Sequence, residues 1–143
     1  MLEGVPGVSS VCMDGLAAGH SVKVPEYDMS THTRTGGHYQ LDPAPLVVVD
    51  GILLMAVEEC RERLDLKVFV DAPREVRLAR RLVRDVEERG RNPQSVEEQF
   101  MTSVEPMHRS LVLPSSQHAD LKFEHPFDPV AAAERVVAEI SPS

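Results

Sequence analysis

Two short apolar runs that each end in an aspartate set the strongest limit on how this chain can fold. Residues 46–49 (LVVV) end at Asp50, and residues 66–70 (LKVFV) end at Asp71. Short apolar runs rich in β-branched side chains are typical of strands buried on both faces of a parallel sheet. Patterns of helical period follow both runs, over residues 53–63 and 74–90. This alternation predicts an α/β domain with a parallel sheet flanked by helices.

The other expected elements fit around this sheet. Residues 22–41 are predicted to form an inserted β-hairpin that turns at Thr35-Gly36-Gly37, and insertions of this kind often contact substrates. A third strand is expected over residues 119–123. Further helices are expected over residues 95–111 and 129–140, the second of them capped by Asp128. Residues 1–15 are weakly patterned, so the domain is expected to span residues 16–143.

Overall composition excludes several classes of protein. The 143 residues carry a formal net charge of −8, which argues against non-specific binding of nucleic acid or anionic membranes. No apolar run reaches the length of a membrane span, and the N-terminus lacks the pattern of a secretory leader. Cys12 and Cys60 do not form a CxxC motif, and the six histidines do not form an HExxH motif. We therefore expect a cytoplasmic domain without a disulfide framework or a zinc site.

Arginine is concentrated in one stretch of the chain. Twelve of the 15 basic residues are arginines, and seven of them fall within residues 74–91, which carry a net charge of +3. The planar guanidinium group can form two parallel hydrogen bonds with a phosphate or a carboxylate. Arg80, Arg81 and Arg84 are close enough along a helix to converge on an anion. The same spacing also fits an ordinary amphipathic helix with a solvated face.

Two further groups of residues have both a chemical and a structural interpretation. Residues 27–34 (YDMSTHTR) combine a phenol, an imidazole, a guanidinium and a carboxylate, which suit a polar ligand that contains a ring. They also suit a polar hairpin tip without a ligand. Asp50 is expected at the carboxyl end of a strand, where an acid can help to hold Mg²⁺ beside phosphates. An aspartate that simply ends a buried strand is equally common.

Several segments together identify a resemblance to a known family. They are PEYDMSTHTR at 25–34, VVDGIL at 48–53, KVFVD at 67–71, VRLARRLVRDVEERGR at 76–91, EQF at 98–100, VEPMH at 104–108, LP at 113–114 and HAD at 118–120. In order and spacing they resemble the uridine kinase (uridine–cytidine kinase) family of P-loop nucleoside kinases, which is related to phosphoribulokinase. The resemblance covers about residues 16–140. It implies a P-loop NTPase-type parallel sheet and ATP-dependent 5′-phosphorylation of uridine or cytidine in pyrimidine salvage.

The resemblance also implies roles for individual residues. Those matching nucleoside contacts of the family are Tyr27, His32, Arg81, Arg91 and Gln99. Those matching the lid over the phosphates of ATP (or GTP) are Arg84 and Arg89, within a lid helix over residues 74–91. Asp128 matches a residue near the adenine, although Pro129 replaces the usual Asn. Asp50 stands where the family usually has Glu, near Mg²⁺.

Two parts of the family pattern have no match in these 143 residues. The phosphate-binding motif GxxxxGK[ST] does not occur, and Asp14, the only aspartate before Asp28, is not in the context of the family's catalytic Asp. The sheet is therefore expected to be incomplete at the N-terminus, with no catalytic residue assigned and with weak or absent phosphoryl transfer by this chain alone. One alternative is a non-catalytic subunit that binds nucleosides or forms oligomers, either with itself or with a full-length relative. The other is a truncated gene product.

Overall fold

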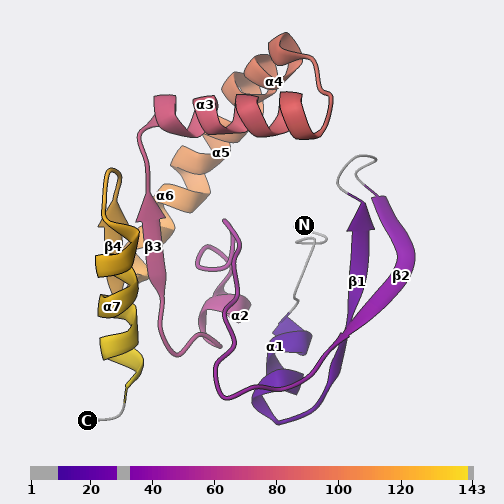
Figure 1. Ribbon diagram of the computed structural model, residues 1–143, viewed down its shortest axis with the longest axis vertical. Coiled ribbons are helices and arrows are strands. Elements are labelled where there is room, and N and C mark those ends of the chain that lie inside the picture. The colour runs from indigo at the N-terminus through magenta and orange to yellow at the C-terminus, as the bar shows by residue number, and fades with distance from the viewer. Residues whose placement is uncertain (1–9, 29–32, 142–143) are drawn as a thin grey trace. The chain divides into compact units, whose positions relative to one another are not determined.

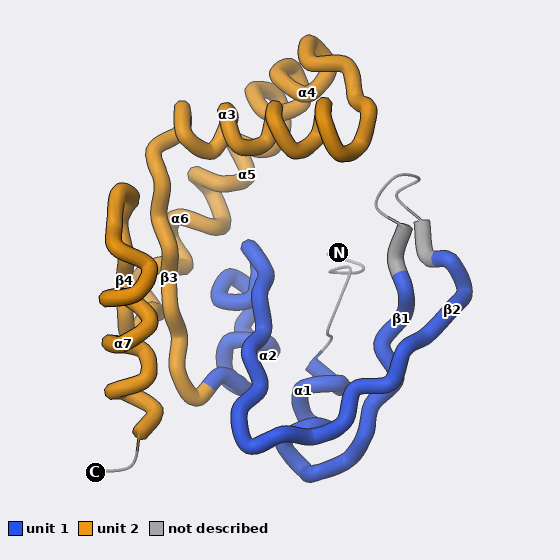
Figure 2. Tube along the Cα trace, in the orientation of Figure 1, with its two compact units in different colours: residues 1–64 blue, residues 65–143 orange. Residues whose placement is uncertain are grey.

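The computed structural model describes residues 10–28 and 33–141. The chain divides into two compact units, residues 1–64 and residues 65–143 (Figure 2). The expected division at residue 16 is not tested by this arrangement and stays a prediction. Within the described ranges, no helix combines the length and the apolar character that crossing a membrane requires.

The described residues of unit 1 form short helices and a β-hairpin (Figure 1). The elements are α1 (Ser10–Ala17), β1 (Val22–Asp28), β2 (Thr33–Leu41) and α2 (Glu58–Arg61). The two strands are antiparallel and pair from Val22↔Leu41 to Asp28↔Thr33. Helix α1 begins within residues that the sequence left weakly patterned, and α2 is much shorter than the helix expected over residues 53–63. The hairpin covers the residues expected for it.

The core of unit 1 holds α1 against the chain that follows the hairpin. Met13, Leu54 and Cys60 form a buried apolar cluster. Gly15 allows α1 to approach β1 closely, because a Cβ at this position would lie 2.5 Å from Cγ1 of Val22. An ion pair joins Arg63 to Asp14, with 2.6 Å between Nε and Oδ1.

The expected turn at Thr35-Gly36-Gly37 is wrong. These residues lie inside β2, where the register moves from Pro25↔His38 to Tyr27↔Arg34. β2 therefore advances four residues while β1 advances two, and this irregularity requires a residue that tolerates a positive φ. Gly36 provides it, with φ at 82°. The connection between the strands falls on residues 29–32, outside the described residues.

The strand expected at residues 46–50 is also wrong. The structure shows no regular element there, and Leu46, Val47 and Val48 are 58%, 43% and 83% exposed. A parallel strand needs neighbouring strands to satisfy its backbone groups and elements on both faces to cover its side chains. Within the described residues, no strand pairs with this segment. The β-branched composition of residues 46–49 predicts a strand, but a strand also needs a neighbouring strand to pair with.

Unit 2 is built on a parallel pair of strands, which confirms the α/β class. β3 (Val68–Asp71) pairs with β4 (Leu121–Glu124) from Val68↔Leu121 to Asp71↔Glu124. Both strands lie within two residues of the expected positions. On one face, Leu121 and Phe123 pack against Ala132 of α7 (Pro129–Ile140). As expected, Asp128 caps α7, and its Oδ1 accepts a hydrogen bond of 2.9 Å from the Val130 amide.

A chain of helices connects the two strands. Helix α3 (Arg74–Val83) continues into the π-helical turn η1 (Arg84–Glu88), and Gly90, with φ at 63°, ends it as expected. The second helical stretch runs from Pro93 to His118. Its parts are α4 (Pro93–Gln99), η2 (Phe100–Val104), α5 (Glu105–Met107), η3 (His108–Val112), α6 (Leu113–Ser115) and η4 (Ser116–His118).

The wide π turns of this stretch have a cause in the sequence. The turns η2 and η3 come just before Pro106 and Pro114. Proline has no N–H to donate, and its ring crowds the carbonyl four residues earlier. A wider turn at these points lets the helix continue past each proline instead of ending there.

A buried carboxylate ties the corner after β3 to this second stretch. Glu105 is 7% exposed, and its two oxygens each accept a hydrogen bond of 2.8 Å, from Arg77 and from Arg109. The Arg77 guanidinium also donates to the carbonyl of Ala72 and lies 5.7 Å from the ring centre of Phe100. Burial alone would raise the pKa of Glu105, but the bonds from both arginines outweigh burial and hold that pKa below its ordinary value.

Replacing Glu105 by glutamine is expected to lower the free energy of unfolding at pH 7 by about 2 kcal/mol, because two guanidiniums lose their anionic partner. Since the pKa is depressed in the folded state, the stability that Glu105 contributes is present above its unfolded pKa and is lost as the pH falls through the folded value. The difference between the wild type and Glu105→Gln should therefore shrink below about pH 4, as urea unfolding followed by circular dichroism would show.

Glu134→Gln is the matched control, because Glu134 is exposed on α7 and the substitution removes the same charge. It should change the stability by less than about 0.5 kcal/mol at any pH. Equal effects of the two substitutions would contradict a structural role for the Glu105 carboxylate.

Candidate functional site

Five of the residues assigned to ligands from the sequence come together at one place in unit 2. They surround Asp85, and we call them and Asp85 the arginine cluster. Its members are Asp85, Arg81, Arg84, Arg89, Arg91 and Gln99. The residues expected to hold the nucleoside and those expected to hold phosphates thus form one network.

Local structure explains this convergence. Arg81 and Arg89 lie four residues before and after Asp85, a spacing that brings their side chains to it along a helix. Gly90 then reverses the chain and brings Arg91 back toward the same carboxylate. Asn92 begins α4 by accepting a hydrogen bond of 3.3 Å from the amide of Ser95. Helix α4 in turn carries Gln99 to the cluster.

Asp85 is the centre of the cluster. Asp85 is 0% exposed. The sequence indicates only that it contributes a negative charge to residues 74–91. Oδ1 accepts from Arg84 Nε at 2.9 Å and from Arg89 Nη1 at 3.2 Å. Oδ2 accepts from Arg91 Nη1 at 3.3 Å and lies 3.5 Å from Arg81 Nε. Both oxygens are therefore occupied by guanidiniums.

Gln99 links the two arginines that face Oδ2 of Asp85. Its Oε1 accepts hydrogen bonds from Arg81 Nη2 at 3.0 Å and from Arg91 Nη1 at 2.9 Å. Because the side-chain oxygen is taken up in this way, the amide NH₂ group of Gln99 remains as its donor. Gln99 is exposed, so this donor can reach a ligand.

The electrostatics of the cluster favour a bound anion. Burial alone would raise the pKa of Asp85, but the hydrogen bond and charge of Arg84 and the charge of Arg81 hold it below its ordinary value. Burial lowers the pKa of Arg81, with Asp85 acting against this shift. Four guanidiniums therefore face one carboxylate, which leaves three positive charges at the site. Their side chains are 21% to 46% exposed.

The remaining assigned residues lie elsewhere or outside the described residues. Tyr27 lies in β1, where its backbone pairs with Arg34, and its side chain is not described. His32 lies outside the described residues. Asp128 caps α7, and the described contacts do not link it to the arginine cluster. These assignments stay predictions.

One of the two reasons for expecting Mg²⁺ near Asp50 is a strand that ends there, and residues 46–50 form no strand. Asp50 is exposed and does not follow a strand, whereas its expected role depended on the carboxyl end of one. Within residues 10–28 and 33–141, no group of three or more His, Cys, Asp or Glu side chains could hold a metal ion. Because one or two carboxylates together with phosphates and water commonly hold Mg²⁺, the assignment of Asp50, which also rests on the family resemblance, stays a prediction.

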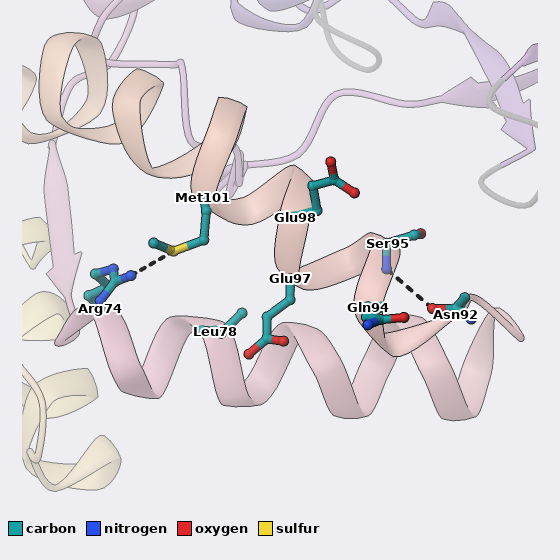
Figure 3. Close-up of a pocket in the computed structure, with 8 residues that line it drawn as sticks. All are labelled: Arg74, Leu78, Asn92, Gln94, Ser95, Glu97, Glu98 and Met101. Carbon is teal, nitrogen blue, oxygen red and sulfur yellow. Dashed lines mark hydrogen bonds between the residues drawn. The ribbon is translucent and has the colours of Figure 1, made fainter.

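A separate cleft lies between α3 and α4 (Figure 3). It has a volume of about 810 Å³, and its lining residues are Arg74, Leu78, Asn92, Gln94, Ser95, Glu97, Glu98 and Met101. No residue of the arginine cluster is among them. With two carboxylates and one guanidinium, the cleft does not favour an anion. Sequence reasoning gave no indication of it, because it is a product of how two helices pack.

Comparison with known proteins supports a single family. Residues 9–128 match the Phosphoribulokinase / Uridine kinase family. The uridine kinase of Deinococcus deserti is 45% identical to the chain over 113 residues, which are 79% of this chain and 55% of that protein. The uridine kinase of Chloroflexus aurantiacus is 40% identical over 128 residues, or 90% and 61% of the two chains.

A further relative gives a similar result. The uridine kinase of Halobacterium salinarum is 36% identical over 132 residues, which cover 90% of this chain and 59% of that protein. The chain thus spans between 55% and 61% of the length of these three relatives. All three matches include most of the residues of this chain.

Proposed function

The chain belongs to the Phosphoribulokinase / Uridine kinase family, and we propose that its arginine cluster binds the phosphate groups of a nucleoside triphosphate and part of a pyrimidine nucleoside. The reaction served by this site is ATP-dependent phosphorylation of the 5′-hydroxyl of uridine or cytidine. The convergence of Arg81, Arg84, Arg89 and Arg91 around one buried carboxylate is the observation that carries this proposal.

The geometry suits the charge changes of phosphoryl transfer. When the 5′-oxygen attacks the γ-phosphorus, the bond from phosphorus to the β–γ bridging oxygen breaks and negative charge spreads over the phosphoryl oxygens. Planar guanidiniums with unused N–H groups stabilise such charge without rearranging. Arg84, with 46% of its side chain exposed, is the member best able to reach a bound triphosphate.

The hairpin of unit 1 is a separate part of the proposal. The family resemblance gives Tyr27 and His32 contacts with the pyrimidine base, and aromatic rings and an imidazole suit such a ring. Divalent magnesium, when bound with ATP, supplies charge neutralisation at the phosphates. The 143 residues contain no GxxxxGK[ST] motif, and no described residue is assigned as the base that takes the 5′-hydroxyl proton. We therefore propose binding with little or no transfer by these 143 residues alone.

The alternative function is a non-catalytic, oligomerising subunit. The exposed apolar run of Leu46, Val47 and Val48 favours it, because such a segment gains from being covered by another chain. Sedimentation velocity with and without the uridine kinase of Deinococcus deserti separates the two functions. Co-sedimentation of the two proteins favours the subunit function. A chain that sediments as a monomer both with and without the relative counts against that function.

Replacing Arg84 by alanine is expected to weaken ATP binding about tenfold, because a charge-assisted hydrogen bond to phosphate is lost. Isothermal titration calorimetry measures this affinity directly. Arg80→Ala is the matched control, since Arg80 is exposed on the same helix and is not among the partners of Asp85. It should change the affinity less than twofold. Equal losses in both variants would show a general charge effect and not a site.

Replacing His32 by alanine is expected to weaken uridine binding about tenfold, measured by equilibrium dialysis with labelled uridine, because a hydrogen-bonding and stacking group is removed. His38→Ala removes the same side chain from an exposed position of β2 and should leave the affinity unchanged. An unchanged affinity in His32→Ala would remove the hairpin from the proposed nucleoside site.

Incubating the purified chain with labelled ATP, magnesium and uridine or cytidine is expected to give no detectable nucleoside monophosphate, while both substrates still bind. The physical reason is the missing phosphate-binding motif, whose amides and lysine would hold the transferred group. Transfer that disappears in Arg81→Ala would show that other groups replace that motif and that our proposal for the isolated chain is wrong.

A further inference from the structure

We infer that Asp85 is a positioning residue of the arginine cluster, which sets the directions in which Arg81 and Arg91 present their free N–H groups to a bound anion. Asp85 itself contacts no ligand in this role. The inference rests on the proposed function, because it takes the arginine cluster to be the anion site.

The burial of Asp85 excludes direct contact with a ligand and favours an indirect role. The residue is 0% exposed, and each of its oxygens already has two guanidinium partners within 3.5 Å. A carboxylate with no exposed surface and no unoccupied oxygen cannot accept a hydrogen bond from substrate. It acts only through the side chains that it holds.

The arrangement leaves most guanidinium donors available. A guanidinium has five N–H groups, and Asp85 engages one nitrogen of each arginine: Nε of Arg81 and Arg84, and Nη1 of Arg89 and Arg91. Gln99 Oε1 accepts from Arg81 Nη2 and from the same Arg91 Nη1 that bonds Asp85. Arg91 is thus held through one nitrogen that bridges Asp85 and Gln99, and Arg81 through its hydrogen bond to Gln99 and its ion pair with Asp85. These contacts limit the directions of the remaining N–H groups before any ligand arrives.

Charge and position predict opposite effects of removing Asp85. An aspartate repels an incoming anion, so on charge alone its neutralisation strengthens anion binding. As a positioning group, however, Asp85 separates four guanidiniums that otherwise repel one another. Without its charge they turn apart toward solvent, and the converging donors are lost. The sign of the change in affinity therefore distinguishes the two roles.

The test is pyrophosphate binding by Asp85→Asn, measured by isothermal titration calorimetry at low ionic strength. We expect the affinity to fall at least tenfold. Glu88→Gln is the matched control, because Glu88 is exposed on the same turn, η1, and loses the same charge. Its affinity should stay equal or rise up to about threefold. An equal or tighter affinity in Asp85→Asn would overturn the inference.

If Asp85→Asn does not fold, a measurement on the wild-type chain tests the positioning role of Asp85. The Nε–H resonance of Arg84 reports its bond to Asp85, and its hydrogen exchange can be followed by nuclear magnetic resonance with and without pyrophosphate. We expect exchange to stay slow in both states, because Asp85 keeps its partners when the anion binds. Exchange that becomes at least tenfold faster with pyrophosphate would show that the anion replaces Asp85 and would overturn the inference.

The two proposals fail in different ways. A wild-type chain that binds neither pyrophosphate nor ATP removes the arginine cluster as an anion site, and both proposals fall with it. Tight binding by the wild type together with tight binding by Asp85→Asn leaves the proposed function standing and overturns only the role of Asp85.

Discussion

A carboxylate with no exposed surface is costly in free energy unless cations compensate for its lost hydration. Asp85 is in this position, and guanidiniums from α3, η1 and the segment before α4 supply the compensation. The arginines also depend on Asp85, because four guanidiniums would repel one another without an anion between them. The packing of α3, η1 and the segment before α4 around this carboxylate therefore depends on a single charge.

The sequence predicted best those elements whose signals are local. The helix formed by α3 and η1 ends before a glycine with positive φ, and α7 is capped by an aspartate followed by proline, so neighbouring residues alone decide these boundaries. Strands depend on partners from elsewhere in the chain. Residues 46–50 have the composition of a buried strand but pair with no strand among the described residues. The bulge at Gly36 was missed for the same reason, since the sequence shows a glycine pair but not the register.

The candidate site was predictable in its chemistry but not in its organisation. The density of arginines in residues 74–91 indicated an anion site, and the structure brings four of them together. What the sequence could not indicate is the role of Asp85. Counted along the chain, it is one of several acids among the arginines, and only burial separates it from Glu87 and Glu88, which are exposed.

The same unit contains a second buried carboxylate, and comparing the two shows which arginines are free for a ligand. Arg77 bonds to Glu105 and to the carbonyl of Ala72 and covers the ring of Phe100. Its polar edge and its flat face are both used within the fold. Arg81 is equally exposed, at 22% of its side chain, and it too uses two guanidinium nitrogens within the fold. Exposure and the number of engaged donors therefore do not distinguish these arginines. The balance of charge does: two guanidiniums share Glu105 and leave one positive charge, whereas four share Asp85 and leave three. An arginine in a nearly balanced pair stabilises a corner, and one in a cluster with this excess is ready for phosphate.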